Sequence, residues 1–220
     1  MWFWLIGAFV FGILTPFMAR RFAKFMPATF AGAIVELLRP EKKSTHYRKT
    51  SLYKKLLRRA LMFGLINSAT TAAIISIFPS TGFIIIYVWF LLLLAEIDIK
   101  MFLLPDILTI PLLLLGLLAA LLGKGILTPD ESISGCFIGY FFPAIISLLI
   151  VWYKKDAFGG GDIKLLSALG AWIGIEGLLY TITLASILGL LWALISRQKS
   201  LAFGPMLAIA GILIMIYIGY

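Results

Sequence analysis

The sequence has one cysteine, Cys136, and one histidine, His46, among its 220 residues. With a single cysteine, neither a disulfide nor a cysteine zinc cluster can form within the chain, and we expect Cys136 to be a small buried side chain. A single histidine in a charged segment excludes a Ser-His-Asp triad and a zinc site built from several histidines. The phosphate-binding patterns G-x-x-x-x-G-K-[ST] and G-x-G-x-x-G are also missing. The chemistry of this chain must therefore come from other side chains.

Charge is scarce as well. Charged residues make up 13% of the chain, hydrophobic residues make up 62%, and the mean hydropathy is +1.06. A soluble domain of this size cannot cover so much apolar surface, so the composition predicts an all-α integral membrane protein. Eight apolar segments are candidate transmembrane helices: 2–18, 60–78, 83–97, 103–122, 133–153, 163–175, 178–196 and 201–219.

Basic residues are concentrated in one segment. Of the 19 Lys and Arg residues, 12 lie between Arg20 and Arg59. This distribution is typical of a cytoplasmic loop beside anionic lipid and not of a nucleic-acid-binding surface. With eight alternating spans, 18 of the 19 basic residues face the cytoplasm, leaving Lys124 outside. Both termini then face away from the cytoplasm, and the first segment is predicted to be a retained anchor.

Two acidic motifs adjoin the short segments 83–97 and 163–175. One is Gly159-Gly160-Gly161-Asp162, and the other runs from Asp98 to Asp106. Both are predicted at the cytoplasmic edge, where a carboxylate beside hydrocarbon marks a candidate functional site. The start of a helix favours the anion of Asp162 and the end of a helix disfavours that of Asp98, so we hypothesise a pair that shares one proton, carried by Asp98. Such a pair suits peptide hydrolysis.

Structural roles compete with these functional ones. Asp162 is also suited to capping a helix after a glycine turn, and Asp106, after Pro105, is suited to an N-cap or a turn. Lys164 is expected to be an anchor on the positive side or to steady the carboxylate or a substrate. We predict that Glu96 is solvated or paired with a lysine at the edge. Asp156, beside two lysines, is assigned to a loop.

These motifs closely resemble those of the type IV prepilin peptidases, members of the GxGD class of membrane aspartic proteases. The resemblance rests on Gly159-x-Gly161-Asp162-x-Lys164 and on Asp98 followed by Leu104-Pro105-Asp106. It is reinforced by 165–172, LLSALGAW, and by 203–211, FGPMLAIAG. It runs from about residue 83 to the terminus and extends loosely to the first segment.

The resemblance implies a catalytic pair, Asp98 and Asp162, in a fold of about eight transmembrane helices. It also implies supporting or substrate-binding roles for six residues: Gly159, Gly160, Gly161, Lys164, Pro105 and Asp106. The implied substrate is the leader of a pilin or of a type II secretion pseudopilin, cut at the cytoplasmic edge of the bacterial inner membrane without metal or cofactor. The corresponding organisation is a first helix at 1–19, a basic loop at 20–59 and a seven-helix peptidase core at 60–220.

Two departures keep alternatives open. Many relatives carry a cytoplasmic zinc domain with two CxxC pairs and methylate the new N-terminus with S-adenosylmethionine, whereas 20–59 has no cysteine. A bifunctional peptidase and N-methyltransferase therefore remains an alternative. Lys100 stands where many relatives have an acid.

A proton-coupled transporter using the two aspartates is a further alternative, which an inverted repeat would support, and a non-catalytic assembly factor is a third.

Overall fold

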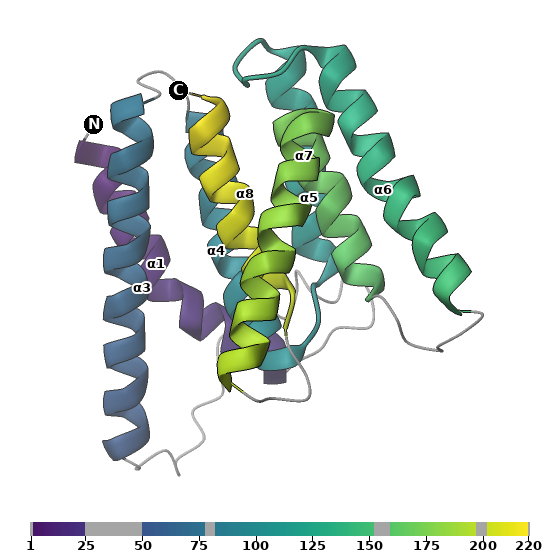
Figure 1. The fold of residues 1–220 in the computed structure, drawn as a ribbon. Coiled ribbons are helices and arrows are strands. Elements are labelled where there is room, and N and C mark those ends of the chain that lie inside the picture. Colours follow the sequence, from purple (N-terminus) through teal and green to yellow (C-terminus); the bar gives the residue numbers. More distant parts are fainter. Residues whose placement is uncertain (1, 25–49, 78–81, 152–158, 197–201, 220) are drawn as a thin grey trace.

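The structure, a computed structural model, describes residues 2–24, 50–77, 82–151, 159–196 and 202–219, and all regular structure within them is helical. The helices are α1 (Trp2–Lys24), α3 (Thr50–Ile77), α4 (Gly82–Met101), α5 (Asp106–Leu121), α6 (Pro129–Val151), α7 (Gly160–Ser196) and α8 (Gly204–Ile218) (Figure 1). Five of them, α1, α3, α4, α6 and α7, are long and apolar enough to cross a membrane, and α5 and α8 are shorter apolar helices. The predicted all-α membrane protein is confirmed, whereas the count of eight spans stays a prediction.

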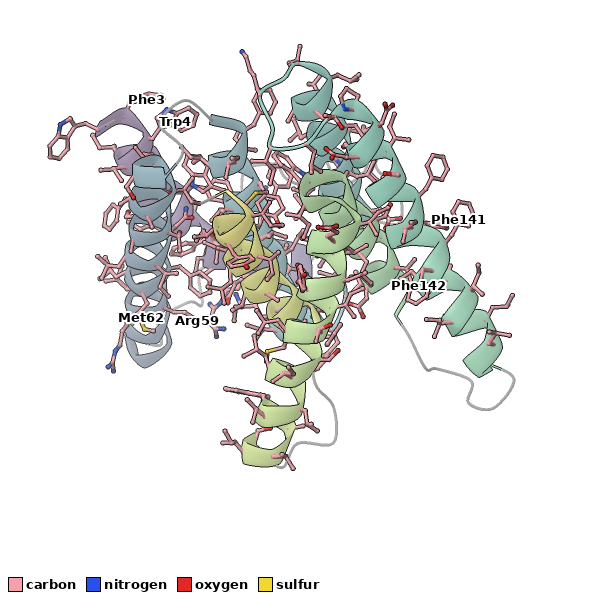
Figure 2. All side chains as sticks on the ribbon, turned by 45° about the horizontal axis from the view of Figure 1, so that its top comes forward. Phe3, Trp4, Arg59, Met62, Phe141 and Phe142 are labelled. Atoms are coloured by element: carbon pink, nitrogen blue, oxygen red, sulfur yellow. The ribbon has the colours of Figure 1, made fainter. Side chains whose placement is uncertain are left out.

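Helix α4 is the centre of the bundle. It contacts α1 and α3 on one side and α5 and α8 on the other. Within its apolar stretch, 61% of the residues are buried, compared with 22–28% in the apolar stretches of the other four long helices. Helices that leave most of their apolar side chains exposed suit a lipid environment, and Phe141 of α6 is an example, pointing outward in Figure 2.

Aromatic packing joins α4 to the second half of the molecule. The rings of Tyr87 on α4 and Trp172 on α7 lie 5.0 Å apart, and both side chains are buried. The indole N–H of Trp172 donates a 2.8 Å hydrogen bond to the backbone carbonyl of Leu112 on α5. A buried indole N–H needs a hydrogen-bond partner, so this bond favours one position of α7 along the length of α5.

Helices α6 and α7 cross at a pair of glycines. A Cβ atom on Gly135 would collide with the backbone carbonyl of Gly170, and a Cβ on Gly170 would collide with that of Gly135. Small residues at a crossing allow two backbones to touch, which is how helices associate where no water drives their packing.

Helix α7 is interrupted at Gly174, whose backbone has φ 70° and ψ −174°. Such a conformation is essentially restricted to glycine. Figure 1 shows that α7 turns back on itself there, so that its second limb returns toward the end where the first limb began. The two limbs correspond to the predicted segments 163–175 and 178–196. The expected break at Glu176-Gly177 was wrong, because these two residues are helical.

Several helix ends meet at one side of the bundle, opposite the side where Figure 1 marks both termini. The end of α1, the end of α4 and the starts of α5, α7 and α8 lie there; we call this side the aspartate edge. Helix α1 continues to Lys24 and α3 begins at Thr50, so both ends of the predicted 20–59 loop are helical, since Lys and Arg favour helices. The rest of that loop, with His46, lies outside the described residues.

Candidate active site

Asp98 lies in the last turn of α4 at the aspartate edge, with 5% of its surface exposed. The backbone N–H of Gly204, at the start of α8, donates a 2.8 Å hydrogen bond to Asp98 Oδ2. The free N–H groups at a helix start favour a carboxylate. We expected the end of α4 to disfavour an anion at Asp98. That expectation considered α4 alone, whereas the start of α8 favours a carboxylate at the same position.

Gly204 allows α8 to approach this closely. A Cβ atom at position 204 would lie 2.7 Å from Asp98 Oδ2, closer than Cβ atoms come to atoms of other residues, and 3.0 Å from its Cγ. Sequence reasoning quoted Gly204 as part of a motif but gave it no role at the site. The signal available was the Phe203-Gly204-Pro205 sequence before an apolar run, since Pro is favoured in the first turn of a helix.

Asp162 lies in the first turn of α7, where free N–H groups are again close. Its own N–H donates a 3.0 Å hydrogen bond to the carbonyl of Gly159, and Oδ2 of its half-buried carboxylate lies against the same glycine. A Cβ at position 159 would be 3.1 Å from that oxygen. Asp162 is therefore the third residue of the helix and not its N-cap.

The structure brings Asp98 and Asp162 to the same edge from helices 64 residues apart in sequence. Their carboxylates are close enough for the negative charge of Asp98 to act on Asp162. Two carboxylates that lie close together can share one proton, because ionising both would place like charges side by side. One can then take a proton from water while the other donates a hydrogen bond to a carbonyl. The arrangement is therefore able to hydrolyse an amide bond.

The turn between α4 and α5 packs against the glycine run. A Cβ on Gly161 would lie 3.0 Å from Leu104 Cβ and 3.3 Å from the Leu104 carbonyl oxygen. The turn itself contains Phe102 at φ 52°, an uncommon conformation for an aromatic residue. Gly160 has no neighbour within 4 Å of a built Cβ and therefore borders open space. Gly161 thus ties the Asp162 helix to the segment that follows Asp98, and Gly160 is left accessible.

Lys164 and Asp106 join the same two segments by an ion pair. Lys164 Nζ lies 2.6 Å from Asp106 Oδ2, with the side chains 40% and 52% exposed. The N-cap of α5 is Pro105, and no side chain caps this helix. The expected N-cap role of Asp106 was therefore wrong: it is the first helical residue, and its carboxylate binds Lys164. The carboxylate that Lys164 steadies is that of Asp106.

Glu96 is completely buried and pairs with a lysine, so of the two alternatives predicted for it the lysine pairing is confirmed. Its carboxylate lies 2.7 Å from Lys100 Nζ and 3.0 Å from Arg59 Nη2. The positive charge at position 100, which departs from the family pattern, therefore has a buried partner one helical turn away.

Other candidates contribute little to this site. Cys136 is partly exposed on α6, and its sulfur lies 3.3 Å from the hydroxyl of Ser167 on α7. This contact joins α6 to α7 and does not involve the aspartates. Among the residues that the structure describes, no group of three or more His, Cys, Asp or Glu could hold a metal ion. Asp156 lies outside the described residues.

Comparisons with known proteins identify the family. The type IV leader peptidase family matches residues 85–194, which are half of the chain and include both aspartates and the glycine run. The matched region begins after α3 and ends before α8. This match confirms the resemblance that the motifs indicated. No solved structure matches the chain significantly.

The relatives share one name, prepilin leader peptidase/N-methyltransferase. That of Pectobacterium carotovorum subsp. carotovorum is 42% identical over 144 residues, covering 60% of this chain and 50% of the relative. That of Dichelobacter nodosus is 41% identical over 147 residues, covering 63% and 49%. That of Neisseria gonorrhoeae is 39% identical over 129 residues, covering 56% and 44%. The chain spans about half the length of the curated relatives it matches.

Proposed function

This chain belongs to the type IV leader peptidase family, and from that membership we propose that it is a membrane aspartic endopeptidase. The observation that carries the proposal is the meeting of Asp98 and Asp162 at the aspartate edge, one from the end of α4 and the other from the start of α7. Asp98 accepts a hydrogen bond from a backbone N–H at the start of α8, and Asp162 lies in the first turn of α7, and a helix start favours a carboxylate.

In the proposed reaction, the ionised member of the pair removes a proton from a water molecule that attacks the scissile carbonyl. The protonated member donates a hydrogen bond to the carbonyl oxygen and stabilises the charge that develops there. When the intermediate collapses, the C–N bond breaks and the departing nitrogen receives a proton from the pair. The carboxyl pair ends with the single proton with which it began, so the reaction consumes only water.

The proposed substrate is the N-terminal leader of a prepilin or a type II secretion pseudopilin, since the relatives are named for prepilin leaders. The aspartate edge suits such a substrate, because an apolar substrate helix can lie in the bilayer while its polar leader reaches the acids. Gly160 borders open space there, and a bare backbone lets an extended leader approach. Basic residues lie on the helix ends that form this edge, which favours a cytoplasmic site in a bacterial inner membrane with anionic lipids as neighbours. They are Arg20, Arg21 and Lys24 at the end of α1, Lys100 at the end of α4 and Lys164 near the start of α7.

The experiment is a cleavage assay with the full chain in detergent or lipid vesicles and a purified prepilin. Wild type is expected to release the leader, and Asp98→Asn and Asp162→Asn are each expected to release none. Asn preserves shape but cannot exchange a proton. Cleavage at the wild-type rate by either variant would remove that acid from the mechanism.

A second activity, N-methylation of the new N-terminus, is raised by the relatives' names. The segment that would correspond to their methyltransferase region, within 20–59, lies mostly outside the described residues, and no step of the proposed hydrolysis uses S-adenosylmethionine. Mass spectrometry of the cleaved product, with and without S-adenosylmethionine, tests this activity separately. A mass increase of one methyl group would establish it.

A further inference from the structure

A group of ion pairs around a buried carboxylate of α4 lies beside the site but takes no part in the proposed chemistry. Glu96, fully buried, lies 3.0 Å from Arg59 Nη2 of α3 and 2.7 Å from Lys100 Nζ, one turn further along α4. Figure 2 shows Arg59 on the side of α3 that faces the other helices. We call these three residues the Glu96 cluster.

Lys100 extends the Glu96 cluster to a third helix. Its ammonium donates a 3.2 Å hydrogen bond to the backbone carbonyl of Pro16, inside α1. The charges of Arg20 and Arg59 are also close enough to act on Lys100. A buried carboxylate surrounded by several cations is held firmly, since moving either partner leaves an uncompensated charge. The Glu96 cluster therefore ties α1 and α3 to the last turn of α4.

The last turn of α4 is also the one that carries Asp98. Two residues along a helix correspond to roughly 200° of rotation, so Glu96 and Asp98 point to opposite faces of α4. Asp98 faces Gly204 of α8, while Glu96 faces α3. Directly after this turn the chain leaves the helix through Phe102 at φ 52°. The turn therefore has no helical continuation to hold it, and the ion pairs on its far face supply a restraint on its rotation.

We propose that Glu96, Arg59 and Lys100 are positioning residues that hold the carboxylate of Asp98 in register with that of Asp162. This inference rests on the proposed peptidase function and assigns a part in it to α1 and α3, which lie outside the region that the family matches. Breaking the cluster allows the last turn of α4 to rotate or slide. Substrate contacts at the glycine run are unaffected, so the defect falls on the chemical step.

The test compares Arg59→Gln with Arg58→Gln in the full chain, using the prepilin cleavage assay. Each removes one arginine charge from the same turn of α3, but Arg58 is exposed and forms no ion pair within the part of the chain that the structure describes. For Arg59→Gln we expect kcat to fall about 10- to 100-fold with KM changed less than about threefold, because a displaced reacting group slows the chemical step. Arg58→Gln is expected to leave both constants within about twofold of wild type.

Two further variants separate positioning from folding. Arg59→Lys keeps a positive charge opposite Glu96 and is expected to restore kcat to within about threefold of wild type. Lys100→Met is expected to reproduce the loss seen with Arg59→Gln. All assays are run well below the lowest Tm in the set, so that loss of folded protein does not contribute.

The outcomes are distinct. Equal kcat for Arg59→Gln and Arg58→Gln, or a loss confined to Tm or to KM, overturns the positioning role. A wild-type enzyme that cleaves no prepilin overturns the proposed function and this inference with it. Wild-type cleavage with no difference between the two arginine variants overturns this inference alone.

Discussion

Two buried acids on opposite faces of α4 differ in what surrounds them. Each carboxylate oxygen of Glu96 lies against a cation, at 2.7 Å for Lys100 and 3.0 Å for Arg59. Asp98, two residues later, accepts one backbone hydrogen bond and lies near the like charge of Asp162. A carboxylate placed between cations holds structure together, whereas one beside a second carboxylate can exchange a proton. In our proposal, a carboxylate on one face of this helix supports the structure and a carboxylate on the opposite face takes part in the reaction.

Asp98→Asn is the strongest test of this contrast. We expect kcat for prepilin cleavage to fall by at least about 10³-fold, because the proton-exchanging group is lost. The free energy of unfolding should change by no more than about 1 kcal/mol, since an amide oxygen still accepts from Gly204. Cleavage kinetics and thermal unfolding in the same detergent check both. A large stability loss with measurable cleavage would assign Asp98 to support instead.

Gly204→Ala tests the reactive face without changing any charge. A methyl group would lie 2.7 Å from Asp98 Oδ2, so either the carboxylate or the start of α8 must move. We expect kcat to fall about 10²-fold, as for other small displacements of a reacting group. Gly125→Ala is the matched control, because its nearest contact is an ordinary 3.4 Å and it lies away from the site. If both variants cleave at the wild-type rate, the close approach of α8 has no catalytic consequence.

Glu96→Gln tests the supporting face. It leaves Arg59 and Lys100 without their counter-charge, and we expect the free energy of unfolding to fall by about 2 kcal/mol, less than for a fully buried pair because Arg59 is 43% exposed. Thermal or denaturant unfolding measures this loss. Glu176→Gln, at an exposed position on α7, should change stability by less than about 0.5 kcal/mol. Equal stability of the two variants would contradict the supporting role.

Lys164→Met should have the smallest effect. Its ion pair with Asp106 is short but partly exposed, and such pairs contribute about 0.2–1 kcal/mol. We expect kcat to fall less than about fivefold, the rate equivalent of 1 kcal/mol. A double-mutant cycle with Asp106→Asn measures the pair directly. A fall in kcat of more than about 100-fold in Lys164→Met alone would show that the ammonium takes part in the reaction. The comparison of Glu96 with Asp98 would then have to include Lys164.

Much of the site was predictable from short stretches of sequence. The apolar segments, the family motifs and the two aspartates at helix ends could all be read locally, because hydropathy and motif spacing depend only on neighbouring residues. The break in α7 was predicted two to three residues too late because Gly174 and Gly177 look alike in sequence, and only the path of the chain decides which adopts φ 70°.

Other features depended on residues far apart in the chain. Asp98 and Gly204 are 106 residues apart, Lys164 and Asp106 are 58 apart, and Arg59 and Glu96 are 37 apart. Each pair is joined by one hydrogen bond or ion pair at the end of a helix. No local pattern records such a partner, since many polar residues near these helix ends could have met instead.

The sequence by itself determined that this chain is a helical membrane protein with two acids in a leader-peptidase motif, because burial in lipid and motif chemistry are properties of segments. Tertiary structure alone decided that Glu96 pairs with Arg59 of α3 and that Asp98 accepts a hydrogen bond from the start of α8. A carboxylate's behaviour depends on the charges and N–H groups within a few ångströms, and packing brings these from distant parts of the chain.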